Sequence, residues 1–193
     1  MRKTNRFYSG DRNGVFCVWS AEDFELVYVE HFHCERIKGI AIHPEENIVA
    51  FCAMDGKVRI LNSETFELNK EIKVSDYSLN SILLDGDCIL TGGKTAFISR
   101  WNWKTGIRFE NQKMHAYAVY DLAFLNDKKY VVSASFDKTI NLWQREGLKL
   151  LDSVNHTREG HRSSVNKICV LSDKKFATIS DDRKIKIWEV DVN

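Results

Sequence analysis

The sequence predicts an all-β protein in which a unit of four strands is repeated about five times. A segment that ends on Trp recurs along the chain, and short runs of alternating polar and apolar residues lie between turn residues. No segment carries the apolar stripe of an amphipathic helix. Because the 193 residues include a single proline, Pro44, and no low-complexity tract, we expect one repeat region over residues 1–193 without an interdomain linker.

The recurring segment is clearest in SASFDKTINLW (Ser133–Trp143) and TISDDRKIKIW (Thr178–Trp188). Each begins with a small hydroxyl residue, passes through a turn that contains Asp and ends on alternating residues and Trp. Three more segments align with them: SGDRNGVFCVW, FCAMDGKVRIL and TGGKTAFISRW. The last residues are Trp19, Leu61, Trp101, Trp143 and Trp188, so the spacings are 42, 40, 42 and 45 residues. A period in this range with strand-turn-strand content is typical of a β-propeller array.

The strands within a unit follow from its alternation and its turn residues. In the fourth unit, four strands are expected at residues 119–125, 130–135, 139–144 and 148–154. Asn126 to Lys129 form the first turn, and Asp137 and Lys138 form the second. The other units repeat this order, which predicts blades of four antiparallel strands.

The order of strands also predicts how complete the ring is. If the strands of a blade are lettered a to d from the channel outward, the first strand here is b, near residues 6–9, and the last is c, at Glu189. This order gives three strands, three complete blades and three more strands, eighteen in all. The first blade lacks strand a and the last lacks strand d, so the two cannot complete each other. We expect an open or partial ring of about five blades.

One segment, LTGGKTAFISRW (Leu90–Trp101), contains the Gly-Lys-Thr tail of a phosphate-binding loop. Such a loop needs a Gly five positions before Gly93, where this chain has Cys88, and a helix after it, where this chain has a strand pattern. The segment also aligns with the other repeats, and Thr95 occupies the place of Asp137. It therefore predicts a turn between strands, and we expect no nucleotide or other cofactor.

The recurring segments resemble those of the WD-repeat β-propeller family, and the resemblance covers nearly all of the chain. Family repeats carry Gly-His upstream of the Trp, and this chain has Gly160-His161, Met114-His115 and Phe32-His33 in that place. In the family, the His joins a strand Ser or Thr, a turn Asp and the Trp in a buried hydrogen-bond chain. The resemblance implies two complete sets: His115, Ser133, Asp137 and Trp143 in the fourth unit, and His161, Thr178, Asp182 and Trp188 in the fifth.

Similar residue types also occur in catalytic and metal sites. His115, Ser133 and Asp137 are the types of a nucleophilic triad, but the same set recurs in the fifth unit together with a Trp, which favours a structural role. The HFHC segment at residues 31–34 has no second ligand pair at zinc-site spacing, so no metal is expected. The acidic pairs Glu45-Glu46 and Asp181-Asp182 lie in predicted turns, where solvated acids are usual. No enzyme activity is expected.

The charge balance narrows the classes of partner. The chain has 28 basic and 27 acidic residues, interleaved from end to end, without the one-sided basic stripe of a nucleic-acid or membrane-surface protein. Trp103, Tyr117, Tyr120 and Phe136 could stack on single-stranded nucleic acid, but without a basic surplus they suit packing or protein contacts better. Five scattered cysteines favour reduced, mostly buried thiols, and no apolar run resembles a signal peptide or spanning helix. We expect a cytoplasmic or other intracellular soluble compartment.

In the family, the top rim is lined by the residue before the turn Asp and by the third and fifth residues after the His. By position, the resemblance implies these rim residues: Arg12, Arg36, Lys38, Met54, Asn80, Lys94, Ala118, Tyr120, Phe136, Ser164, Asn166 and Asp181. Arg36, Lys38, Tyr120 and Phe136 are the expected contact patch, because Arg and aromatic residues dominate binding hot spots. Such a patch suits an acidic peptide with an apolar anchor.

The resemblance implies a non-catalytic scaffold that binds peptides or domains of other proteins on its rim. Self-association through the open blade edges is a further expectation. Two alternatives stay open on the sequence alone. The chain could be a truncated fragment of a longer propeller protein without independent activity, or a nucleic-acid-associated WD-repeat subunit, whose binding would depend steeply on salt.

Overall fold

The computed structural model describes residues 5–43 and 45–191, so Pro44 and the outermost residues of the sequence lie outside the described part. Within it, eighteen strands form five antiparallel sheets, which we call blades 1 to 5. Blade 1 contains β1 (Arg6–Gly10), β2 (Val15–Ser20) and β3 (Leu26–His31). Blade 2 contains β4 (Ile37–Ile42), β5 (Ile48–Ala53), β6 (Lys57–Asn62) and β7 (Leu68–Lys73).

The remaining blades follow in chain order. Blade 3 contains β8 (Leu79–Asp85), β9 (Cys88–Gly93), β10 (Phe97–Asn102) and β11 (Arg108–Lys113). Blade 4 contains β12 (Val119–Leu125), β13 (Tyr130–Ser135), β14 (Ile140–Gln144) and β15 (Lys149–Val154). Blade 5 contains β16 (Val165–Ser172), β17 (Lys175–Ser180) and β18 (Ile185–Glu189). The predicted all-β fold, with three, four, four, four and three strands, is confirmed.

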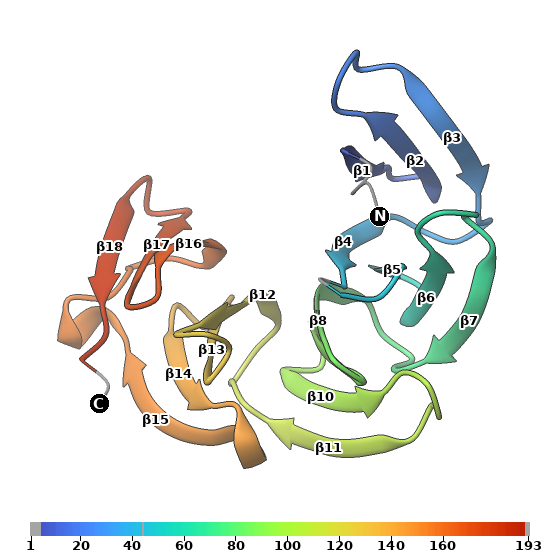
Figure 1. The fold of residues 1–193 in the computed structure, drawn as a ribbon. Helices are drawn as coiled ribbons and strands as arrows, with labels where there is room; N and C mark the ends of the chain where they lie inside the picture. Colours follow the sequence, from blue (N-terminus) through green and yellow to red (C-terminus); the bar gives the residue numbers. More distant parts are fainter. Residues whose placement is uncertain (1–4, 44, 192–193) are drawn as a thin grey trace.

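Figure 1 shows the blades following one another around an open arc, from blade 1 in blue to blade 5 in red. The inner strands β4, β8, β12 and β16 lie side by side on the inner side of this arc, and β1 adjoins β4. We call β2, β6, β10, β14 and β18 the Trp strands, although Leu61 replaces the Trp in β6, and β3, β7, β11 and β15 the outer strands. The described strands leave the ring open between blades 1 and 5, as the sequence predicts.

The apolar core lies between neighbouring blades, because each sheet buries side chains on both faces. The Trp of one blade packs against β-branched and aliphatic residues of the preceding blade: Trp101 lies with Val58 and Ile60, and Trp188 lies with Ile140. Blades 1 and 2 share an aromatic cluster in which the rings of Phe16 and Phe51 stack at 5.3 Å. Each blade therefore depends on its neighbours for burial, as expected of a repeat protein.

The structure departs from the sequence prediction in two details. Two short 3-10 helices, η1 (Glu146–Leu148) and η2 (His156–Arg158), flank β15, so the predicted strand at residues 148–154 starts one residue late. All five cysteines are free, but only Cys34 and Cys52 are buried and Cys169 is exposed, so the expectation of mostly buried thiols is wrong.

In the described residues, no helix is long and apolar enough to cross a membrane.

The glycines of the LTGGKT segment have a packing role. Gly92 and Gly93 end β9, and Lys94 to Ala96 form the turn to β10, so a strand follows where a phosphate-binding loop needs a helix. A Cβ added at Gly92 would lie 2.6 Å from Val119 Cγ1 of blade 4, and one at Gly93 would lie 2.3 Å from the carbonyl oxygen of Ser78. These residues are small because neighbouring atoms approach closely.

Candidate functional site

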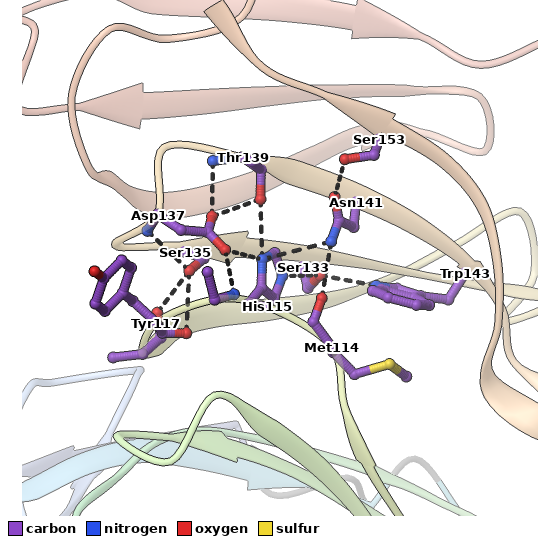
Figure 2. Close-up of polar contacts among 12 residues, drawn as sticks. Met114, His115, Tyr117, Ser133, Ser135, Asp137, Thr139, Asn141, Trp143 and Ser153 are labelled. Atoms are coloured by element: carbon purple, nitrogen blue, oxygen red, sulfur yellow. Dashed lines mark hydrogen bonds and ion pairs between the residues drawn. The ribbon is translucent and has the colours of Figure 1, made fainter.

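Blade 4 contains a continuous chain of buried hydrogen bonds, which Figure 2 shows. Trp143 Nε1 donates to Ser133 Oγ at 2.8 Å, and Ser133 Oγ lies 2.7 Å from His115 Nε2. His115 Nδ1 lies 3.0 Å from Asp137 Oδ2, and the backbone N–H of Ala116 donates to the same oxygen at 2.9 Å. With an ionised Asp137, the proton order is Trp N–H to Ser, Ser O–H to His and His Nδ1–H to Asp. The chain links the segment before β12 to β13, β14 and the turn between them.

Blade 5 repeats this arrangement with Thr in the place of Ser. Trp188 Nε1 donates to Thr178 Oγ1 at 2.8 Å, and Thr178 Oγ1 lies 2.8 Å from His161 Nε2. His161 Nδ1 lies 2.9 Å from Asp182 Oδ2, which also accepts from the backbone N–H of Arg162 at 3.0 Å. The structure thus brings together all four residues of each set that the sequence identifies.

The two turn carboxylates are held in the ionised form. Burial by itself would raise the pKa of Asp137, but hydrogen bonds from His115, Thr139 and the Ala116 backbone outweigh it and hold the pKa well below its usual range. At Asp182, burial is again opposed, here by the Arg162 backbone N–H and by His161, and the pKa is lowered to about 2. Ser133 and Thr178 are fully buried, so their hydroxyl oxygens have no path to a substrate. The sets suit the role of clamps that fix each turn to its blade.

The other blades keep only parts of the set. In blade 1, Trp19 Nε1 donates to Ser9 Oγ at 2.9 Å on the exposed side of the sheet. Blade 3 has no His, and within the described residues Thr91 Oγ1 and Trp101 Nε1 are buried without a hydrogen-bond partner. In blade 2, Asp55 instead forms an ion pair with the buried Arg59 at 2.8 Å.

The HFHC segment does not assemble a metal site. The rings of His31 and His33 lie 4.3 Å apart, but His31 Nε2 is already 2.7 Å from the carbonyl oxygen of Asn13, and Cys34 is buried. No group of three or more possible metal ligands occurs among the described residues. Phe51 and Leu61 occupy the Ser and Trp places of this repeat, so His33 has no set to join.

The inner strands carry several of the rim residues to one place. Lys38, Asn80, Tyr120, Asn166 and Lys167, from blades 2 to 5, line a shallow cavity of about 360 Å³. We call this cavity the inner rim. Asn166 Nδ2 also donates to Asp181 Oδ1 at 2.6 Å. The inner rim therefore combines two exposed amines with amide and phenol groups.

An aromatic cluster adjoins the inner rim. The ring of Phe136 lies 6.0 Å from Tyr120 and 5.8 Å from Tyr117, and both contacts are edge-to-face. Tyr117 is 61% exposed and Phe136 is 47% exposed, so both rings present apolar surface to solvent. The other eight rim residues do not line the cavity. Ala118 is half-buried and Ser164 is buried, and the remaining six are exposed: Arg12, Arg36, Met54, Lys94, Phe136 and Asp181. Lys94 lies over the ring of Tyr77 instead, at 5.8 Å.

Asp121 is a central residue that the sequence reasoning missed. It is 7% exposed on β12, where Oδ1 accepts from Ser81 Oγ at 3.1 Å and from Lys167 Nζ at 3.3 Å. Oδ2 accepts from the backbone N–H of Ile168 at 2.9 Å. One carboxylate therefore joins blades 3, 4 and 5 beneath the inner rim. The available signal was a single acid within the otherwise apolar strand VYDLAFL.

The blades are antiparallel sheets arranged around a common inner side, and two of them contain a buried His–Asp set linked to their Trp strand. This arrangement defines a repeat protein of the β-propeller class. The family described as WD domain, G-beta repeat matches residues 24–62, 109–144 and 152–189, more than half of the chain. The chain therefore belongs to the WD-repeat family, and the resemblance seen in the sequence is confirmed.

Curated relatives are similar over most of the chain. It is 23% identical to a WD repeat-containing protein WDS homolog of Arabidopsis thaliana, over 93% of this chain and 35% of the relative. It is 25% identical to TSET complex member tstF of Dictyostelium discoideum, over 69% of this chain and 14% of the relative. It is 30% identical to a ribosome biogenesis protein WDR12 homolog of Trichoplax adhaerens, over 58% of this chain and 27% of the relative. The chain thus spans about a third or less of the length of these relatives.

The names of these relatives give no catalytic function, and WD-repeat proteins are generally scaffolds without enzyme activity. Two of the three are described as members of a complex or of ribosome biogenesis. The family and its relatives therefore support a protein-interaction scaffold as the class of function.

Proposed function

We propose that this chain is a non-catalytic scaffold whose inner rim binds an acidic segment of a partner protein, with an apolar side chain of that segment against the Phe136 cluster. The observation that carries the proposal is the juxtaposition of Lys38 and Lys167 with exposed aromatic rings across blades 2 to 5. An acidic segment with an apolar side chain needs a cationic group and an apolar surface on the chain that binds it, and this region supplies both.

The charges at the inner rim favour an anion. Lys167 contacts Asp121, but an ammonium group has three N–H donors, and the side chain of Lys167 is 59% exposed. Lys38 is exposed and forms no ion pair among the described residues. Tyr120 and Asn80 add polar groups between the two amines. A carboxylate in this cavity can therefore meet two amines, one carried by β4 and one by β16.

The aromatic cluster supplies the anchor site. Exposed aromatic rings offer large apolar area at a small cost in side-chain entropy and are enriched at binding hot spots. Phe136 occupies the turn between β13 and β14, which the His115 set pins, so its position is fixed before a partner binds. Arg36, which directly precedes β4 of blade 2, extends the cationic part of the same surface in this proposal.

A random peptide library displayed on phage and selected on the immobilised chain tests the proposal. We expect enrichment of peptides that combine Asp or Glu with Phe, Leu or Trp. Substituting Lys38→Ala or Phe136→Ala should weaken the selected peptides about tenfold, the loss of roughly 1.4 kcal/mol per anchor. The matched controls are Lys113→Ala and Phe109→Ala, which change exposed residues of β11. Peptides that bind all four variants equally would sink the proposal.

The relatives favour assembly as the setting for this function. The Dictyostelium relative is a member of the TSET complex and the Trichoplax relative is a ribosome biogenesis protein. If this chain is a part of a longer protein, the inner rim would act as one docking surface within a larger scaffold. The nucleic-acid alternative predicts that the chain binds a single-stranded oligonucleotide and that this affinity falls steeply as salt rises, which a titration at two ionic strengths would reveal.

A further inference from the structure

The rim residues change character from blade to blade, and the proposed function uses only part of this change. The position before the turn Asp, which is Thr95 in blade 3, holds a different residue type in each of blades 2 to 5, in the order Met54, Lys94, Phe136 and Asp181. The fifth residue after the His position varies in the same way, in the order Lys38, Asn80, Tyr120 and Asn166. Along the arc in Figure 1, the rim therefore passes from cationic at blades 2 and 3 to aromatic at blade 4 and acidic at blade 5.

Asp181, the acidic residue of this series, is held in place by its own blade. It lies in the turn between β17 and β18, and its backbone N–H donates to the carbonyl oxygen of Ser164 at 3.1 Å. The next residue, Asp182, belongs to the His161 set, which pins the same turn. Asn166 Nδ2 donates to Asp181 Oδ1 at 2.6 Å, and Asn166 also lines the inner rim. The Asp181 carboxylate is therefore fixed beside the inner rim.

This carboxylate can still accept from a cation. An ionised carboxylate has about four acceptor sites on its two oxygens. Among the described residues, the Asp181 side chain accepts only from Asn166 and forms no ion pair, and Asp181 is exposed. Two cations near this turn, Arg162 and Lys184, line a separate cavity of about 330 Å³ together with Asp182. A basic side chain that reaches the inner rim thus meets a carboxylate without a competing partner.

The distance along the rim suits a short extended segment. Lys38 and Asn166 line the same cavity, so an acid bound at Lys38 and a base bound at Asp181 are separated by little more than the width of that cavity. An extended segment rises about 3.3 Å per residue and points every second side chain to the same face. Five residues therefore present three side chains to the rim over about 13 Å.

We infer that Asp181 binds a basic residue of the partner segment, which then carries an acid, an apolar residue and a base in that order from blade 2 to blade 5. The inference rests on the proposed function, because the acid and the apolar residue are those that the inner rim and the Phe136 cluster bind. Opposite charges at the two ends of the rim fix the register of the segment, since a shifted segment would bring like charges together. Asp181 is thus a specificity-determining residue of the scaffold.

Four capped pentapeptides, acetylated and amidated so that they carry no terminal charge, test the inference. The reference peptide is Glu-Gly-Phe-Gly-Lys, and two others replace its Lys by Ala or by Glu. The fourth, Glu-Gly-Lys-Gly-Phe, has the same composition as the reference peptide with the base in the middle. Each is titrated into the nitrogen-15-labelled 193-residue chain, and the chemical shifts of backbone and Asn side-chain amides give both the affinity and the location.

We expect the reference peptide to bind about threefold more tightly than the Ala peptide, as for an exposed ion pair, and more tightly than the reordered peptide. The Asn166 side-chain amide should shift more with the reference peptide than with the Ala peptide. The Asp181→Lys chain should reverse the preference and bind the Glu peptide better than the reference peptide. Asp173→Lys makes the same charge change in the turn between β16 and β17, at the other end of blade 5, and should leave the preference unchanged.

The outcomes distinguish this inference from the proposed function. If the reference and Ala peptides bind equally and both weaken with Lys38→Ala, the proposed function stands and the inference is overturned. If no peptide shifts the amides of the inner rim, both are overturned. A preference for the reference peptide that Asp173→Lys removes as fully as Asp181→Lys would show an effect of net charge alone, and this result would overturn the inference as well.

Discussion

Replacing Ser133 by Ala tests how much a buried hydrogen-bond set contributes to stability. Ser133 Oγ is the partner of both Trp143 Nε1 at 2.8 Å and His115 Nε2 at 2.7 Å, and the Ser133 side chain is fully buried. The substitution leaves an indole N–H and an imidazole nitrogen without a partner away from water. Because each such group costs about 1–3 kcal/mol, we expect a loss of about 3 kcal/mol in the free energy of unfolding.

Ser9→Ala is the matched control. Ser9 occupies the same strand place in blade 1, where its hydroxyl accepts one bond from Trp19 at 2.9 Å, but it is exposed and water can replace it. We expect a loss below about 1 kcal/mol. Urea denaturation followed by far-ultraviolet circular dichroism measures both variants, since the strands of all blades contribute to that signal. Equal losses for the two variants would refute the reasoning that burial makes the set costly to break.

Three more predictions concern the turns and the inner strands. The pKa values of Asp137 and Asp182 are lower in the folded chain than the unfolded value near 3.8, so the ionised carboxylates stabilise the fold above that pH, and this contribution is lost as pH falls from about 4 towards 2. In acid denaturation, the double Asp→Asn variant should start from a lower free energy of unfolding, and that free energy should fall less steeply over the same pH window. Asp121→Ala should cost about 1–3 kcal/mol and speed hydrogen exchange first at the start of β16, and unchanged exchange at Ile168 would contradict the link between blades 4 and 5. Gly56→Ala should prevent stable folding of blade 2, because φ is +76° and the new Cβ would lie 2.0 Å from the Ser75 carbonyl oxygen. Gly86→Ala, with φ +51° and open space around it, should cost only about 1 kcal/mol. Similar thermal midpoints for the two variants would contradict this explanation.

Much of the fold could be predicted because its determinants are local. Strand alternation, turn residues and a Trp at a period near 42 residues place each strand without knowledge of its neighbours. The His115 and His161 sets follow for the same reason, since each joins positions at fixed distances along one repeat. The structure places η1 and η2 beside β15, where the sequence shows only turn residues and no period.

Contacts between blades could not be predicted in the same way. Asp121 meets Ser81 and Lys167, which lie about one repeat away on either side, and nothing in its own strand identifies these partners. The Arg59 ion pairs were missed because this repeat lacks the Trp and the Ser of the usual set, so its turn Asp has a different partner. The inner rim combines four blades, and positional correspondence alone placed Lys38 and Tyr120 there but not Lys167.

The most direct test of the scaffold proposal is a hydrogen-exchange comparison of the chain alone and with a peptide selected by the inner rim. Docking at the inner rim predicts slower exchange at the starts of β8, β12 and β16 and in the turn that carries Phe136, with the outer strands unchanged. Slower exchange confined to the outer strands, or none at the inner rim with a peptide that binds, would contradict the proposal that the inner rim is the docking surface.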